Sequence, residues 1–206
     1  MDSIVKKYKQ KFRRIKDEMG RWEELQSRLI SQFSNASAII QRLQVITDSR
    51  NYGALRCVEF IEDAVLEKQM ESLRIILISI EKTMDEFRGV VSSLEKIVRD
   101  GRQLVKMGSG QLTRKQLNQR IGIKPTLAYC LDALRELEEM HQSEYRLKLS
   151  VVSALSDLAL KPGESRDLDA LQKLLVDQPN IPREEVKEIY DIIFAEEISQ
   201  GDQFQI

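Results

Sequence analysis

The sequence contains few of the residues that build catalytic, metal or disulfide sites. Among its 206 residues are two cysteines, nine glycines, four prolines and a single histidine, His141. Cys57 and Cys130 form no CxxC pair, so neither a zinc finger of that type nor a disulfide scaffold is expected. Sandwiches and barrels are excluded as well, because they need many Gly- and Pro-rich turns. Catalysis would lack most of its usual side chains.

Long apolar runs are also absent. No run approaches the roughly 18 residues that a membrane span needs, and charges occur throughout the start of the chain. We therefore expect neither a signal peptide nor a membrane helix, and a location in the reducing cytoplasm or the nucleus. What the chain has instead is 32% charged residues and abundant Leu, Ile and Gln. This composition is typical of helical proteins.

The net charge of −1 conceals an uneven distribution of charge. Residues 1–16 hold seven basic side chains and one acidic, residues 99–124 again hold seven and one, and residues 161–206 hold five and eleven. The sequence thus predicts a basic start, a basic middle and an acidic end.

Two long helices are predicted by apolar side chains that alternate in steps of three and four. The first, over residues 5–43, has a polar interruption at Gln26, whereas the second continues without one. The stretch Leu73–Ile80 is apolar nearly all round, so it should contact neighbours on two faces, which requires a third helix or another subunit. The two seams comprise Val5, Tyr8, Phe12, Ile15, Met19, Trp22, Leu29, Phe33, Ala36, Ile40 and Leu43, and then Leu66, Met70, Leu73, Leu77, Ile80, Met84, Phe87, Val91, Leu94 and Val98.

A third long helix begins at Pro125, a residue suited to a first helical position, and ends at 161–163. Its apolar stripe has two polar exceptions, Glu138 and Lys148. The stripe comprises Leu127, Leu131, Leu134, His141, Tyr145, Val152, Leu155 and Ala159.

Three short helices complete the prediction. One starts at Thr113, where a Thr-x-x-Gln capping box can form, and ends at Gly122. Another covers residues 168–176 with Asp167 as its cap, and the last begins at Pro182 with glutamates in its first turn.

Together these elements predict an all-α fold: an elongated bundle of three long helices with short helices in the linker and at the C-terminus. The bundle would cover residues 1–160 and include a basic flexible linker at 100–124, which contains Asp100-Gly101 and Gly108-Ser109-Gly110. Residues 161–198 would form short acidic helices that pack on the bundle or on a partner. Residues 199–206 would be a disordered tail.

The few residues capable of chemistry favour structural roles. His141 occupies an apolar step of the third stripe, which indicates a packed or interfacial histidine and not a general base. Cys57 and Cys130 are interpreted as ordinary buried thiols. Neither a Walker-type nor a GxGxxG phosphate loop is present. We expect no catalytic residue, no cofactor and no metal.

Partner contact is expected on apolar positions that the bundle leaves uncovered. The last helix, acidic on one side and apolar on the other, either docks in a partner's groove or closes the bundle on itself. The candidates for partner binding are Leu73, Leu77 and Ile80 in the second helix, Trp22 in the first, and Ile189 and Ile193 in the last.

Electrostatic contact with nucleic acid or a ribosome is expected in the basic linker, because mobile basic loops suit phosphate backbones. For the basic start between Lys6 and Lys16 three interpretations stay open: a solvated face, an acidic protein partner, or RNA or DNA. The linker candidates are Arg102, Lys106, Arg114, Lys115 and Arg120.

Several motifs are spread over nearly the whole chain. They are Lys11-Phe12-Arg13 and Trp22-Glu23-Glu24-Leu25-Gln26 near the start, Asp177-Gln178-Pro179-Asn180-Ile181-Pro182 near the end, and Pro125, Ala128, Leu131 and Leu134 followed by Glu138 and Tyr145 in the third helix. With these motifs the chain resembles a plant branch of the AIRIM-type ribosome maturation factor family. Only the pattern in the third helix is similar to animal members.

The resemblance implies a non-enzymatic helical adaptor. Such a subunit joins a second small helical protein similar to the cyclin-dependent-kinase-interacting protein CINP and binds AAA+ ATPases of the SPATA/AFG type. The implied roles are late maturation of the large ribosomal subunit (pre-60S) in the cytoplasm, and protein extraction at replication forks in the nucleus. Two alternatives stay open: a coiled-coil tether or scaffold, and a direct RNA- or DNA-binding helical protein.

Overall fold

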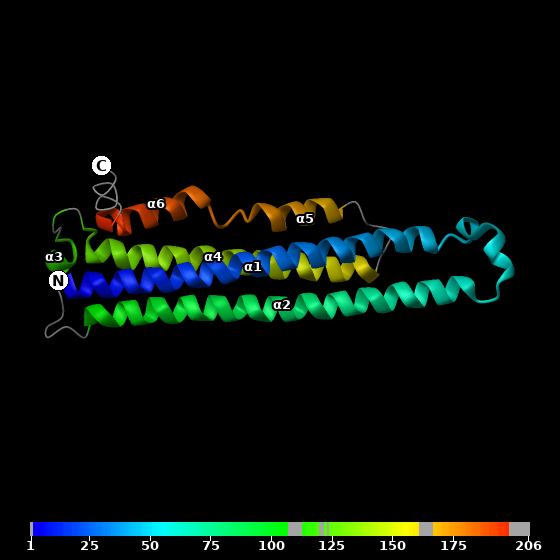
Figure 1. The fold of residues 1–206 in the computed structure, drawn as a ribbon, viewed down its shortest axis with the longest axis horizontal. Helices are drawn as coiled ribbons and strands as arrows, with labels where there is room; N and C mark the ends of the chain where they lie inside the picture. Colours follow the sequence, from blue (N-terminus) through cyan, green and yellow to red (C-terminus); the bar gives the residue numbers. More distant parts are fainter. Residues whose placement is uncertain (1, 107–112, 120–121, 123, 161–166, 198–206) are drawn as a thin grey trace, which may run out of the picture. The chain divides into compact units, whose positions relative to one another are not determined.

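Helices form almost all of the part of the chain that the structure describes (Figure 1). The computed structural model describes residues 2–106, 113–119, 122, 124–160 and 167–197. The predicted all-α class with three long helices is confirmed, whereas the tail at 199–206 and the Gly108-Ser109-Gly110 segment lie outside the described residues. The elements are α1 (Asp2–Ile46), the 3-10 helix η1 (Ser49–Cys57), α2 (Ile61–Lys106), α3 (Arg114–Leu117), α4 (Leu127–Leu160), α5 (Leu168–Asp177) and α6 (Arg183–Ile193).

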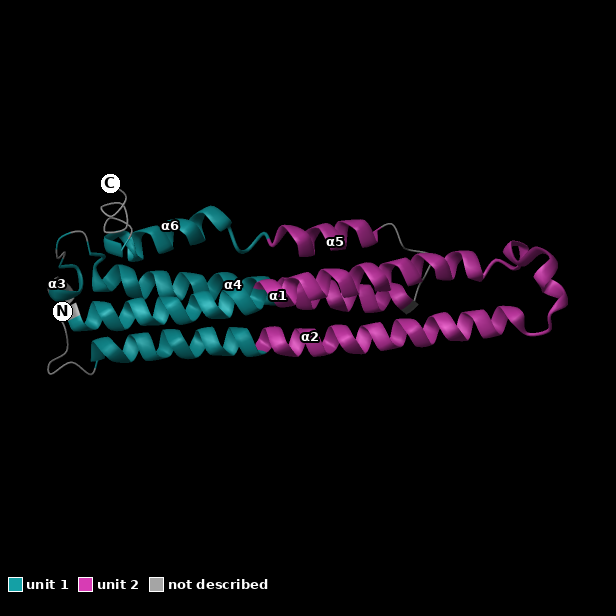
Figure 2. Ribbon diagram, viewed as in Figure 1, with its two compact units in different colours: residues 1–22, 89–145, 179–206 teal, residues 23–88, 146–178 magenta. Residues whose placement is uncertain are grey.

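The chain divides into two compact units, each of which contains parts of all three long helices (Figure 2). Unit 1 comprises residues 1–22, 89–145 and 179–206, so that α6 packs with one half of α1, α2 and α4. Unit 2 comprises residues 23–88 and 146–178, where α5 joins the other halves. No helix within the described ranges is long and apolar enough to cross a membrane.

The predicted seams form the cores of these units. In the first seam every apolar member except Met19 is buried, and in the second the buried run extends from Leu73 to Val98 with Leu77 half-buried. Leu66 and Met70, at the start of the second seam, are more exposed. Within unit 2 the α1–α2 hairpin extends past the ends of α4 and α5 (Figure 2). Burial of the remaining seam supplies the main favourable term for folding.

Gly101 corrects the predicted boundary of the basic linker. The glycine was expected to end the second long helix near residue 100, but α2 continues through it to Lys106. A Cβ atom on Gly101 would lie 2.9 Å from Leu134 Cδ1, and Tyr8 Oη donates a 2.8 Å hydrogen bond to the Gly101 carbonyl. This glycine therefore allows close packing of α1, α2 and α4 in unit 1 instead of forming a turn.

The ends of the short helices agree with the prediction only in part. Thr113 and Gln116 form the predicted capping box: Thr113 N donates to Gln116 Oε1 at 2.8 Å and Gln116 N donates to Thr113 Oγ1 at 3.4 Å. However, α3 ends at Leu117, and Gly122 has a left-handed φ of 60° beyond it. Asp167 precedes α5 but makes no side-chain capping bond, contrary to its predicted role.

The start of α4 also differs from the prediction. Pro125 was expected at the first helical position, but the helix begins at Leu127 and Thr126 caps it, since Thr126 Oγ1 accepts a 3.1 Å hydrogen bond from Tyr129 N. Pro125 thus lies just before the cap, where its fixed φ restricts the chain that enters the helix.

Two polar interruptions of the seams meet in the core of unit 2. Lys148 of α4 is fully buried, and its Nζ donates a 2.6 Å hydrogen bond to Gln26 Oε1 of α1. Gln26 Nε2 in turn donates to the Leu175 carbonyl at the end of α5. The ammonium also lies 5.6 Å from the ring centroid of Phe87 on α2. Lys148 and Gln26 together therefore connect α1, α2, α4 and α5 within this unit.

We expect Gln26→Leu to destabilise the protein by about 1–3 kcal/mol, because it removes an acceptor from the buried Lys148 and a donor from the Leu175 carbonyl. Urea unfolding followed by circular dichroism measures this loss of free energy. In the double variant Gln26→Leu/Lys148→Met the cost should be smaller than the sum of the two single changes, because the ammonium is removed together with its acceptor.

Gln41→Leu is the matched control, since Gln41 is an exposed glutamine of the same helix. Its effect should stay within about 0.5 kcal/mol. If the double variant loses as much free energy of unfolding as the two single variants together, Gln26 and Lys148 do not stabilise each other.

Candidate functional site

Most of the predicted partner-binding side chains are buried in the hydrophobic core. Leu73 and Ile80 of α2 and Ile189 and Ile193 of α6 are buried. The expectation that the bundle leaves these side chains uncovered is therefore corrected, because the long helices and α6 bury them within their own units. Leu77 alone among the six predicted residues remains half-buried.

Trp22 is also a core residue. It is 1% exposed, and its ring meets the His141 ring edge-on at a centroid distance of 5.0 Å. His141 is packed as predicted: it is buried, and its Nδ1 bonds to the Leu137 carbonyl at 2.7 Å. The histidine therefore serves the packing of α1 against α4 in unit 1.

The structure resolves the two alternatives for the last helix in favour of closure on its own bundle. The apolar stripe of α6 is buried in unit 1, and Tyr190 Oη donates a 3.2 Å hydrogen bond to the Phe12 carbonyl of α1. Burial raises the pKa of Tyr190, with a smaller contribution from the nearby charge of Asp17. The phenol thus stays protonated and keeps donating. The first-turn glutamates, Glu184 and Glu185, are present as expected.

An apolar groove lies on the outer side of the segment that was predicted to contact a partner. Its volume is about 620 Å³, and Met70, Leu73 and Leu77 of α2 form one wall while Ser156 and Ala159 of α4 form the other. The small side chains on α4 leave the hollow open, since they fill less space than the leucines opposite. The groove belongs entirely to unit 2.

Charged side chains line the rim of this groove. They are Glu67, Glu71 and Arg74 of α2. Arg74 donates two hydrogen bonds to Glu71, of 2.7 and 2.6 Å, which lower the pKa of Glu71. One carboxylate, Glu67, makes no such ion pair among the described residues, so the rim carries a net negative charge.

Three exposed apolar residues on α2 were not among the predicted site residues. Met70 is exposed in the groove itself, and Ile75 and Ile78 are exposed on the adjacent face. A signal for Ile75 and Ile78 was present, because Leu73–Ile80 is apolar nearly all round and only one side of a helix can pack on its own bundle. The heptad pattern assigned the partner contacts to Leu73 and Ile80, which are the side chains that this bundle covers.

The basic candidates are divided between a helix and the segment after it. Arg102 and Lys106 are exposed on the last turns of α2, not in a loop. Arg114 and Lys115 are the first two residues of α3, and Arg120 lies outside the described residues. Arg102 and Lys106 thus lie on a helix and not in a loop. The described residues do not bring the five basic candidates together in one site.

Groups suited to chemistry are scarce in the described ranges. These ranges contain no cluster of three or more His, Cys, Asp or Glu side chains that could hold a metal ion. Both cysteines are free thiols, but only Cys130 is buried; Cys57 is exposed in η1, which corrects its predicted burial.

The fold and the groove define an all-α protein of long paired helices that leaves one apolar face open. Within that class, the chain belongs to the family described as Ribosome biogenesis protein C1orf109-like, whose sequence pattern matches residues 2–198. No curated protein matches the chain. The family match agrees with the coarser part of the resemblance, which is a role in ribosome biogenesis.

We expect only one of the two thiols to react with iodoacetamide at about pH 8. Burial raises the pKa of Cys130 to about 12, so its thiolate is scarce at that pH, whereas Cys57 is exposed. Peptide mass mapping after alkylation should find the adduct on Cys57. In urea both cysteines should react. Comparable rates of modification at both sites in the folded protein would contradict the burial of Cys130.

Proposed function

We propose that this chain is a non-enzymatic helical adaptor of an AAA+ ATPase complex that acts in maturation of the large ribosomal subunit. Its partners would be a SPATA/AFG-type ATPase and a second small helical subunit resembling CINP. The family to which the chain belongs supports the setting, since it is described as a ribosome biogenesis family. The cytoplasm and the nucleus are the proposed compartments, and replisome or chromatin proteostasis would be a second role.

The observation that carries this proposal is the apolar groove of unit 2. Amphipathic helices bind in such grooves with apolar side chains at positions i, i+3 or i+4, and i+7. From Glu67 to Leu77 the α2 wall covers roughly 15 Å, or about three helical turns. A partner helix of that length, apolar on one face and basic at its edge, would complement the leucines and the acidic rim. Such a partner helix would lie between α2 and α4 of this chain.

The burial and hydrogen bonding of the potentially reactive side chains support the proposal of a role without catalysis. His141 and Cys130 are buried in the core, and the carboxylate of Glu144 accepts hydrogen bonds from Asn180 N and Nδ2 at 3.2 and 3.1 Å. These three groups serve packing within unit 1. The alternative function, a homodimeric coiled-coil tether, would use the same groove for self-association. Sedimentation equilibrium distinguishes the tether from the adaptor, because a monomeric protein does not use the groove to dimerise.

We expect Met70→Asp/Leu77→Asp to reduce capture of the ATPase and of the small helical subunit by about tenfold or more, because two carboxylates would be desolvated against the partner helix. Pull-down of the purified chain with its cognate ATPase and immunoblotting measures the effect. Ile80 is left unchanged because it is fully buried, and an aspartate there would unfold the core.

Val45→Asp is the matched control, since Val45 is an exposed apolar residue of α1 that does not line the groove. Capture should be unchanged in this variant, and circular dichroism melting should confirm that all variants are folded. Full capture by the double variant would remove the groove from the partner interface.

Reversal of the basic side chains Arg102, Lys106, Arg114, Lys115 and Arg120 to glutamate should weaken association with ribosomal precursor particles. The weakening should be stronger at low salt than at high salt, because each lost phosphate contact lowers the dependence of affinity on salt. Sucrose-gradient sedimentation of the chain with precursor particles gives the measurement. Unchanged co-sedimentation across the salt series would exclude this stretch as the contact.

A further inference from the structure

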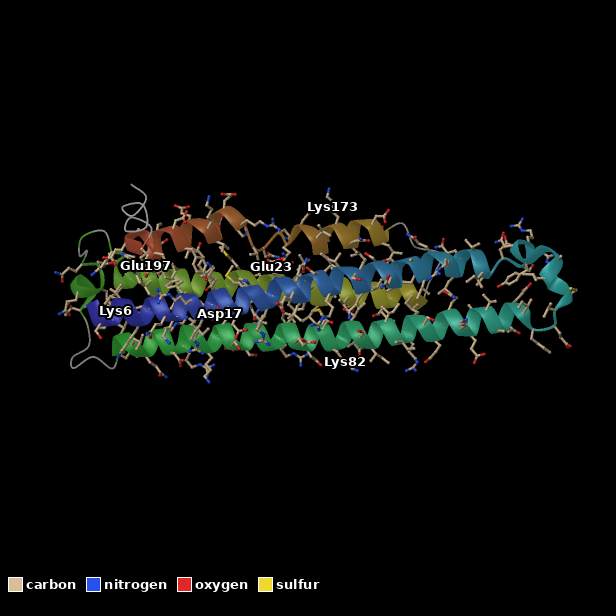
Figure 3. The ribbon with its side chains drawn as sticks, in the orientation of Figure 1. Lys6, Asp17, Glu23, Lys82, Lys173 and Glu197 are labelled. Atoms are coloured by element: carbon tan, nitrogen blue, oxygen red, sulfur yellow. The ribbon has the colours of Figure 1, made fainter. Side chains whose placement is uncertain are left out.

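Four cationic side chains of unit 1 converge on one cavity of about 520 Å³. Three come from α1 and the fourth, Lys124, precedes the Pro125-Thr126 entry to α4; two carboxylates that follow α6 complete the charged lining. Lys6 and Glu197 lie at the same end of this unit (Figure 3). The charged lining residues are Lys6, Lys9, Arg13, Lys124, Glu196 and Glu197.

The two carboxylates bind three of the four cations. Lys9 Nζ donates to Glu196 Oε2 at 3.1 Å, and Arg13 Nη2 donates to both oxygens of Glu197 at 3.1 Å. Lys124 Nζ lies 3.6 Å from Glu196 Oε1. Lys6 is exposed and makes no ion pair within the described part of the chain. The cavity therefore keeps an excess of positive charge although most of its cations are paired.

Apolar and aromatic packing holds the carboxylates in place. Phe194 stacks on Tyr190 with centroids 6.1 Å apart, and the Arg13 guanidinium lies 5.6 Å from the centroid of the Phe194 ring. Beneath them Ile189 and Ile193 are buried. Since α6 is held by this packing, neutralising Glu196 and Glu197 should change the charge of the cavity without releasing the helix.

We propose that this cavity is a phosphate-binding site for single-stranded RNA, and that Glu196 and Glu197 weaken it by competing for its cations. Carboxylate and phosphate oxygens accept the same charge-assisted hydrogen bonds from Arg and Lys, so the two glutamates occupy positions that phosphates can take. RNA adds a regular series of charges and the release of counterions, which a single acidic side chain lacks. The choice of RNA as ligand rests on the proposed role in ribosome maturation.

The test uses the full chain and a fluorescein-labelled single-stranded RNA of about 20 nucleotides, with binding followed by anisotropy over about 50–200 mM KCl. Glu196→Gln/Glu197→Gln should tighten binding about fivefold or more at the low end of this range, because two competing charges are removed. Lys6→Gln should weaken binding and lower the salt slope by about 0.7, the value for one phosphate contact on a single strand.

Lys16→Gln is the matched control, because Lys16 is an exposed lysine of α1 outside the cavity. It should leave the affinity and the slope near those of the unchanged chain. Equal effects of Lys6→Gln and Lys16→Gln, or no tightening in the double glutamine variant, would overturn the proposal. The proposal would also be overturned if polyglutamate competed as effectively per charge as unlabelled RNA, because the ligand would then be an acidic peptide.

ATPase capture by the same variants is measured separately, and it should be unchanged. Failure of the RNA site is therefore distinguishable from failure of the adaptor role.

Discussion

The burial of one ammonium group constrains the packing of unit 2 more than any single apolar contact. An ammonium removed from water loses several kcal/mol of hydration unless hydrogen bonds replace that hydration. Lys148 is fully buried, and its bond to Gln26 Oε1 is possible in only one register of α1 against α4. Apolar seams alone would tolerate a shift by one heptad, because leucines can replace one another at a seam position. Since Gln26 also donates to the Leu175 carbonyl, the same register determines where α5 ends on the bundle, and α5 leads to the segment from which α6 begins.

How much of this arrangement the sequence predicts depends on the range of the interaction. Local signals were sufficient for the three long helices, for the capping box at Thr113 and for the helix after Pro182. Gln26 and Lys148 each stood out as a polar exception to an apolar pattern, but nothing in the sequence connects residues so far apart. Gly101 shows the opposite limitation, because a glycine that permits close helix packing has the same local signature as one that forms a turn.

The candidate site follows the same division. The segment that would remain open was predictable, because Leu73–Ile80 is too apolar to be served by one neighbour. The side that remains open was not predictable, because it depends on how α4 packs against α2. Within unit 2, Met70 is exposed and Leu77 half-buried at the groove between α2 and α4, whereas Leu73 and Ile80 are covered. A groove arises where the small residues Ser156 and Ala159 of α4 face the large apolar side chains of α2.

The uneven charge along the sequence has a structural consequence within unit 1. Two glutamates from the acidic end of the chain, Glu196 and Glu197, lie against the basic start and bind Lys9 and Arg13. Part of the opposite charge of the two ends is therefore neutralised inside the fold, and the positive charge available to a ligand is the remainder, which includes Lys6. The apolar groove belongs to unit 2 and contains none of these residues. A change of charge at the cavity thus leaves the groove chemically unaltered, so the two proposed contacts, one with a partner helix and one with phosphate groups, can be separated by substitution.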